Sequence, residues 1–252
     1  VNSCTVTNFG DQKSRKWLRR AKRENPGAVT VLTGCYPQAF PDEAAEIAEA
    51  DVVTGSGNRH AILTDVQKVL NGEEERVVDI RPHEKGERFE ELPMDKFAEH
   101  TRAFVKVEDG CNRRCAYCVI PSLRGRYRSR TMESLLAEAR TLAESGVKEL
   151  IVIAQDITRY GTDIYGKRML GQLLQELCRL DFHWVRLHYL YPDEVDESLI
   201  DVIASERKIV KYIDIPLQHI NDGILKAMNR RSTKAEILAL LARLRARLPG
   251  LV

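Results

Sequence analysis

Hydrophobic and polar positions alternate along the first 72 residues in a pattern that predicts strands followed by helices. The spacing of apolar residues predicts strands at 29–33 and 51–55 and helices at 11–24, 41–49 and 58–71. Pro41 suits the first turn of the second helix, because its missing N–H has no partner there in any case. Alternating strands and helices imply a mainly parallel sheet, so we expect residues 1–72 to form a parallel α/β domain.

Residues 73–100 are charged and lack a period, which predicts a linker with one short strand at 77–80. From residue 101 the alternation returns and continues to residue 252. It predicts strands at 103–107, 150–154, 184–190 and 209–215 and helices at 131–145, 169–180, 196–205 and 232–247. Thr131 caps the first of these helices and Gly146 ends it. About four strand–helix units are too few for a closed eight-fold barrel, so we expect a partial (β/α) barrel over residues 101–252.

Composition narrows the class of protein only slightly. Hydrophobic residues make up 43% of the chain, which is enough for a sizeable core. The net charge of +2 does not mark a nucleic-acid binder by itself. No apolar run reaches the roughly eighteen residues of a membrane span, and there is no signal-peptide pattern, so we expect no membrane partner. The chain begins at Val1 and ends where another strand would start, and we expect it to be truncated at both ends.

The strongest chemical signal is a loop directly after the strand at 103–107. Cys111, Cys115 and Cys118 follow the spacing C-x3-C-x2-C. Three thiolates on one loop can bind three irons of a [4Fe-4S] cube and leave the fourth iron open, unlike the four cysteines of ferredoxins. A structural zinc site is the alternative, but it needs a fourth ligand, and neither His100 nor His188 stands at a convincing spacing.

This spacing resembles that of the radical S-adenosylmethionine (SAM) superfamily. The resemblance implies that SAM binds the open iron and that one electron splits it to a 5′-deoxyadenosyl radical. It also implies that Tyr117 packs near the adenine, although plain loop packing explains this residue equally well. The resemblance further implies that Gln155, Asp156 and Gln218 contact SAM. From the residues alone, they are polar groups at the mouth of a barrel. Cys178 lies on an apolar helix face, and we expect it to be a buried thiol.

Residues 2–4 read like the end of a buried strand, and Cys35 follows the strand at 29–33, which places Cys4 and Cys35 on the same edge of a parallel sheet. From two cysteines alone, a pair of free thiols is as good an explanation as a ligand site. Their flanks, at 2–8 and 33–38, and the stretch 120–130 resemble the methylthiotransferases of the MiaB, MtaB and RimO group. That resemblance covers nearly the whole chain. It implies a flavodoxin-like or Rossmann-like N-terminal domain and a second [4Fe-4S] cluster on Cys4, Cys35 and a cysteine before Val1.

The two halves of the chain resemble different members of that group. The stretches 5–11 and 89–93 resemble MtaB, which modifies N6-threonylcarbamoyladenosine beside the tRNA anticodon. The stretches 154–161, 187–192 and 212–219 resemble RimO, which modifies an aspartate of a small-subunit ribosomal protein. Residues 12–23 carry seven Lys and Arg and no acid, and residues 113–130 carry six Arg and no acid. Such clusters suit phosphate backbones, while a solvated basic helix, or arginines that pair with the SAM carboxylate and the cluster charge, explains the second cluster at least as well. Because both clusters fall near the expected sites, the sequence favours tRNA as the partner and leaves the ribosomal protein as the alternative.

The resemblance implies that the substrate radical captures a methylthio group, with hydrogen removed from adenine C2 or from the aspartate β-carbon. Such chemistry needs no general base, and the sequence offers no convincing acid–base pair. The cofactors imply a reducing electron donor, such as flavodoxin or ferredoxin, and a cytoplasmic location. A non-catalytic iron–sulfur or zinc module is the alternative from another class of protein.

Overall fold

The computed structural model of the chain describes residues 1–5, 7–92 and 101–252. Internal contacts divide it into two compact units. The N-terminal unit comprises Val1–Leu92 and Val119–Arg126, and the C-terminal unit comprises the described residues from Thr101 to Cys118 and from Tyr127 to Val252.

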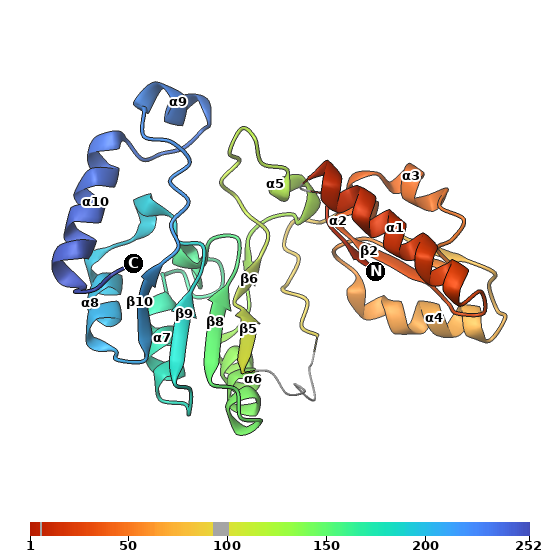
Figure 1. The fold of residues 1–252 in the computed structure, drawn as a ribbon, viewed down its shortest axis with the longest axis horizontal. Coiled ribbons are helices and arrows are strands. Elements are labelled where there is room, and N and C mark those ends of the chain that lie inside the picture. The colour runs from red at the N-terminus through yellow and green to blue at the C-terminus, as the bar shows by residue number, and fades with distance from the viewer. Residues whose placement is uncertain (6, 93–100) are drawn as a thin grey trace. The chain divides into compact units, whose positions relative to one another are not determined.

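The N-terminal unit is built on a parallel sheet of four strands in the order β1-β2-β3-β4. The strands are β1 (Asn2–Ser3), β2 (Val31–Gly34), β3 (Val52–Thr54) and β4 (Val77–Asp79). The helices are α1 (Asn8–Glu24), α2 (Cys35–Ala39), α3 (Pro41–Ala45), α4 (Ile62–Leu70), which follows a 3₁₀ turn at Arg59–Ala61, and α5 (Ile120–Leu123). The predicted parallel sheet is confirmed, and Figure 1 shows α1 and α4 as its two long helices.

Local chemistry explains where these helices begin and how they pack. Thr7 caps α1 because its hydroxyl accepts a hydrogen bond from Gly10 N at 3.1 Å. Leu18 on the inner face of α1 then belongs to one buried apolar core with Leu32 of β2, Tyr36 of α2 and other residues. The helix predicted at 41–49 ends at Ala45, because the chain turns there to bury further apolar residues in this core.

Two segments lie in a different unit from the one the sequence predicts. The segment 73–100 was expected as a linker, but β4 pairs with β3 along its whole length and the described residues of the segment belong to the N-terminal unit. Residues 119–126, expected within the barrel, belong there too. Ser56 Oγ donates to the carbonyl of Leu123 at 2.5 Å, and α5 packs on α2. The contacts that decide these assignments lie far apart in the sequence, so periodicity does not reveal them.

The C-terminal unit contains a second parallel sheet of four strands, in the order β5-β8-β9-β10. The strands are β5 (Arg102–Lys106), β8 (Glu149–Ile153), β9 (Trp184–Leu187) and β10 (Ile209–Ile213), and a small antiparallel pair is formed by β6 (Glu108–Asp109) and β7 (Arg128–Ser129). The helices are α6 (Met132–Glu144), α7 (Leu170–Cys178), α8 (Glu197–Ser205), α9 (Asp222–Ala227) and α10 (Lys234–Arg247), with 3₁₀ turns at Ile157–Arg159 and Pro192–Glu194. The order and direction of the strands are those of a partial barrel (Figure 1).

Helices α6, α7, α8 and α10 pack against one another in a row, and α6 and α7 also contact strands of the sheet. Leu135, Leu173 and Ile200 from three of these helices are fully buried in the core that they share with the strands. Thr131 caps α6 as predicted, since its hydroxyl accepts from Ser134 N at 3.3 Å. Cys178 is buried in the same core, and burial raises the pKa of its thiol to about 11.

Each strand of this sheet points its carboxyl end toward the same edge, so the loops that follow them gather there. In α/β folds this edge is where ligands bind. None of the helices in the part of the chain that the structure describes is long and apolar enough to cross a membrane.

Candidate functional site

The cysteine loop leaves the sheet after β5 and β6 and turns at Gly110, whose φ of 80° is a left-handed conformation that favours glycine. Cys111 and Cys115 are buried and Cys118 is half-buried, and all three are free thiols. The amide of Cys118 donates to the carbonyl of Cys115 at 2.9 Å, which closes a tight turn. Three thiol side chains are therefore brought together on one loop at the carboxyl edge of the sheet.

The loop is fastened to the segment that follows α9. Ala116 N donates to the carbonyl of Met228 at 3.0 Å, and the Asn229 side-chain amide donates to the carbonyl of Arg114 at 2.8 Å. Arg114 and Asn229 both have positive φ angles, of 52° and 56°. Among the described residues, the other non-glycine residues with positive φ are Tyr189 and Gln218, which follow β9 and β10. Backbone strain of this kind gathers at functional sites, and here all of it lies in loops at the carboxyl edge.

The sulfur of Cys115 has two polar neighbours from distant parts of the sequence. Arg230 Nη1 lies 3.8 Å from Cys115 Sγ, and the Tyr191 hydroxyl lies 3.8 Å from the same sulfur. The Arg230 guanidinium stacks 4.4 Å from the centre of the Tyr191 ring and donates to the carbonyl of Pro216 at 2.6 Å. Burial alone would lower the pKa of Arg230, but its hydrogen bond to Cys115 raises it on balance. The Arg230 guanidinium is therefore held beside the sulfur of Cys115 by a ring contact and a backbone hydrogen bond.

Arg113 is the electrostatic centre of the site. Its side chain is only 5% exposed, and it pairs with Asp156 at 3.0 Å, with Asp193 at 2.5 Å and with Glu194 at 3.2 Å. The guanidinium also lies 4.2 Å from the centre of the Tyr191 ring. Burial alone would lower the pKa of Arg113, but Asp156 and Asp193 raise it on balance. Arg113 therefore ties the cysteine loop to the loops that follow β8 and β9.

These pairings correct the interpretation of the basic cluster at 113–130 as a surface for phosphate. Arg113 forms ion pairs with three acids of its own chain. Arg128 is buried 3.8 Å from Asp109, and Arg130 pairs with Glu138 and donates to Ser134. Sequence alone does not distinguish a solvated arginine from a buried one that has a distant acidic partner.

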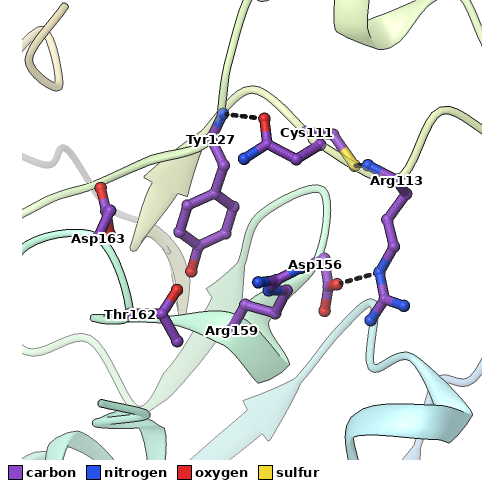
Figure 2. A pocket seen from close by; sticks show the side chains of 8 residues that line it. Cys111, Arg113, Tyr127, Asp156, Arg159, Thr162 and Asp163 are labelled. Carbon is purple, nitrogen blue, oxygen red and sulfur yellow. Dashed lines mark hydrogen bonds and ion pairs between the residues drawn. The ribbon is translucent and has the colours of Figure 1, made fainter. Parts of the chain in front are cut away.

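A cavity of about 260 Å³ opens beside Cys111 (Figure 2). It is lined by Cys111, Asn112, Arg113, Tyr127, Asp156, Arg159, Thr162 and Asp163. The Asn112 side-chain oxygen accepts a hydrogen bond from Tyr127 N at 3.2 Å, which joins two of the residues that line the cavity. Glu108 is fully buried nearby and accepts from Asp156 N at 3.2 Å, and burial raises its pKa well above the usual range. Burial raises the pKa of the Cys111 thiol to about 11.

The residues expected to contact SAM occupy different positions. Asp156 lines the cavity, but it is buried and already bonded to Arg113 and to Thr158 N. The Gln155 side-chain amide donates to Asp109 Oδ1 at 3.2 Å. Tyr117 is 52% exposed on the cysteine loop, and Gln218 is exposed after β10. Gln155, Gln218 and Tyr117 are not among the described residues that line the cavity, so their expected contacts with SAM remain predictions.

Cys4 and Cys35 each come directly after one of two neighbouring strands. β1 pairs in parallel with β2 with Ser3 opposite Gly34, so each cysteine is the first residue after its strand. Cys4 is exposed and Cys35 is buried at the start of α2. Gly34 has a φ of 100°, and a Cβ there would lie 2.6 Å from the carbonyl oxygen of Ser3. The strands can therefore approach closely beneath the two thiols only with glycine at this position.

The donor set suits a cluster. Among the described residues, no three Cys, His, Asp or Glu side chains converge on a point that would hold one metal ion. A cube makes a different demand, because three of its irons each take one thiolate and the thiolates stand around a group several ångströms wide. Of the histidines considered for zinc, His188 lies 4.0 Å from Asp214, and His100 lies outside the described residues.

Sequence reasoning missed Arg230, Tyr191 and Asp193. Arg230 lies far along the chain from the cysteines, and its role depends on a loop whose course the hydropathy pattern does not reveal. The one local signal for these residues was that polar and aromatic residues follow each strand. This marks the carboxyl edge of the sheet but does not identify which side chains turn inward.

Comparison with known families and structures agrees with this geometry. The sequence matches the Radical SAM superfamily over residues 105–252 and the family described as Uncharacterized protein family UPF0004 over residues 1–55. It is 40% identical to the ribosomal protein uS12 methylthiotransferase RimO of Lachnoclostridium phytofermentans over 100% of this chain and 58% of that protein. Identity to the RimO of Pelobacter propionicus is 42%, over 100% of this chain and 56% of that protein. The chain thus spans somewhat more than half the length of these curated relatives.

Two solved structures share the fold. TsrM from Kitasatospora setae, a radical SAM methyltransferase, matches 100% of this chain and 54% of its own with a TM-score of 0.70 and 17% identity. OxsB, a cobalamin-dependent SAM radical enzyme, matches 94% of this chain and 37% of its own with a TM-score of 0.60 and 12% identity. At such identities the likeness concerns the fold alone. The predicted α/β fold and the predicted resemblance to radical SAM methylthiotransferases are confirmed.

Proposed function

Because this chain belongs to the radical SAM superfamily, we propose that Cys111, Cys115 and Cys118 hold a [4Fe-4S] cluster with SAM at its open iron, in a methylthiotransferase. The observation that carries the proposal is the placement of three thiols on one loop, at the carboxyl edge of a parallel sheet and beside a cavity. When bound, the cluster and SAM supply the radical that removes hydrogen from an inert C–H bond.

The residues around the loop hold it ready for that chemistry. Arg230 and the Tyr191 hydroxyl approach the sulfur of Cys115, and such polar neighbours tune a cluster's reduction potential. Arg113 joins the cysteine loop to Asp156 and Asp193, so the three loops keep one arrangement. The cavity beside Cys111 provides a space partly screened from water, in which a reactive species would be protected from side reactions.

The substrate that we propose is an aspartate side chain of ribosomal protein uS12. Relatives of 40–42% identity over the whole chain are named as methylthiotransferases of that protein. This favours the alternative over our first expectation of tRNA. That expectation rested on the MtaB-like first half and on two basic clusters, and in one of these Arg113, Arg128 and Arg130 pair with acids of the same chain.

The substrate assignment is tested in a host that lacks its own methylthiotransferases and expresses the full reading frame. We expect a mass increase of one methylthio group, about 46 Da, on uS12, located to an aspartate by fragmentation. Nucleosides from digested tRNA, analysed in parallel, should contain no 2-methylthio product. A 2-methylthio nucleoside together with unmodified uS12 would contradict the substrate assignment and restore tRNA.

We further propose that Cys4 and Cys35 are two ligands of a second [4Fe-4S] cluster. Their adjacent places at the ends of paired parallel strands support this, and both cysteines lie within residues 1–55, which match a family of their own. The low-potential clusters imply a reduced flavodoxin or ferredoxin as electron donor and a cytoplasmic location.

Replacing Cys35 with Ala in the full reading frame is expected to remove about four irons per protein while leaving SAM cleavage measurable. The reason is that the cluster on the other loop keeps its three thiolates. Cys178→Ala provides the matched control, because Cys178 is also a buried free thiol but lies in an apolar core. The measurement is the iron bound per protein after anaerobic reconstitution. If Cys35→Ala binds as much iron as the wild type, the second cluster is rejected.

A further inference from the structure

The outward face of α1 carries a groove that the proposed chemistry does not use. The groove has a volume of about 440 Å³ and is lined by Phe9, Gln12, Lys13, Lys16, Trp17 and Arg20. Phe9, Lys13 and Trp17 are spaced four residues apart, which places them along one face of the helix. Phe9 is 75% exposed and Trp17 is 52% exposed. Large apolar rings left in water around a hollow mark a surface that contacts a partner.

The charges of α1 are divided between its two faces. The basic residues toward the sheet are engaged: Arg15 pairs with Asp11 at 3.2 Å and Lys22 pairs with Asp51 at 2.7 Å. Lys13 and Lys16, which line the groove, form no ion pair with any described residue and are exposed. Their ammonium groups therefore add a positive charge to the groove that no acid of the described chain balances.

The aromatic rings and the cations lie side by side. The Arg20 guanidinium lies 5.3 Å from the centre of the Trp17 ring and pairs with Glu24 at 2.7 Å, so one edge of the groove is a stacked pair. A tryptophan face beside lysines is the combination that binds RNA, since bases stack on the ring and phosphates pair with the ammonium groups. An acidic peptide would satisfy the lysines but would leave the two exposed rings without a matching partner.

We propose that this face of α1 docks onto ribosomal RNA next to the substrate protein. The inference rests on the proposed function, because a ribosomal protein is presented on a particle whose surface is largely RNA. The chemistry concerned is that of an RNA backbone with at least one unpaired base. Docking through α1 would hold the enzyme on the particle without taking part in the reaction at the cysteine loop.

Binding of the full-length protein to purified small ribosomal subunits is the test, with Lys13→Glu/Lys16→Glu and Trp17→Ala as variants. All three residues are exposed, so the fold should tolerate the changes. Removing two phosphate contacts is expected to weaken binding at least about tenfold at low salt. It should also reduce the slope of log affinity against log salt concentration by roughly 1.5. Trp17→Ala is expected to weaken binding about tenfold with the salt slope unchanged, because stacking is not ionic.

Lys85→Glu/Lys234→Glu is the matched control, since it changes the net charge equally at two exposed lysines that are not part of α1. It should bind subunits nearly as wild type does. Equal binding by all variants would overturn the proposal, as would stronger binding to tRNA than to subunits, or self-association of the wild type through this face. Methylthiolation of free uS12 is measured alongside. If the wild-type protein does not modify free uS12, the proposed function is rejected. If the α1 variants modify free uS12 as the wild type does but no longer bind subunits, the docking surface is supported.

Discussion

Replacing Cys111 with Ala is expected to abolish SAM cleavage completely. The remaining two thiolates on the loop cannot hold the cube, because each of three irons needs its own sulfur ligand. After anaerobic reconstitution, we expect the variant to lose about four irons per protein and to release no 5′-deoxyadenosine above background. Chromatography of the reaction products measures the second quantity directly.

Two comparisons separate loss of the cluster from loss of the fold. Cys115→Ala and Cys118→Ala should behave as Cys111→Ala does, whereas Cys178→Ala should keep both iron and SAM cleavage. The circular dichroism of all four variants should match that of the wild type. Deoxyadenosine production by Cys111→Ala at an undiminished rate would show that the cysteine loop is not where SAM is cleaved.

Replacing Arg113 with Ala is expected to have the largest effect on stability of any change discussed. It leaves Asp156 and Asp193 without their cation at the centre of the site, and Asp156 is almost completely buried. Removing one partner of a buried ion pair typically costs about 3–5 kcal/mol of the free energy of unfolding. The uncompensated carboxylate is the cause, so Arg113→Ala/Asp156→Asn should recover part of the loss.

Urea unfolding followed by tryptophan fluorescence measures this effect. The chain has two tryptophans, and Trp17→Phe leaves Trp184 on β9 as the reporter of the C-terminal unit. Arg114→Ala is the neighbouring control: Arg114 is exposed, and a change there should stay within about 0.5 kcal/mol. A similar cost for the two substitutions would mean that the ion pairs around Arg113 add nothing to stability.

The parts of the fold that the sequence revealed are those set by local pattern. The strands of both sheets were placed within a few residues, because buried parallel strands are short apolar runs. The cysteine loop was found because its three thiols are close together in the sequence. The short elements α5, α9, β6 and β7 were missed, since two to six residues do not establish a period.

The rest of the site depends on contacts between distant residues. Arg230 reaches Cys115, and Arg113 reaches Asp193, only because the loops after successive strands meet at one edge. The pattern predicted that edge, but not which side chains turn inward and pair. For the same reason Arg113 looked like a phosphate ligand in the sequence, and in the structure it is the buried partner of three acids.

The electron paramagnetic resonance spectrum of the reduced protein, recorded with and without SAM, tests the central claim most directly. Cys35→Ala in the full reading frame provides the sample, so that only the cluster on the loop of Cys111, Cys115 and Cys118 contributes. We expect a [4Fe-4S] signal whose g values change when SAM is added, because SAM binds the iron that has no cysteine ligand. A spectrum that ignores SAM, or a protein that takes up zinc and no iron, would contradict it.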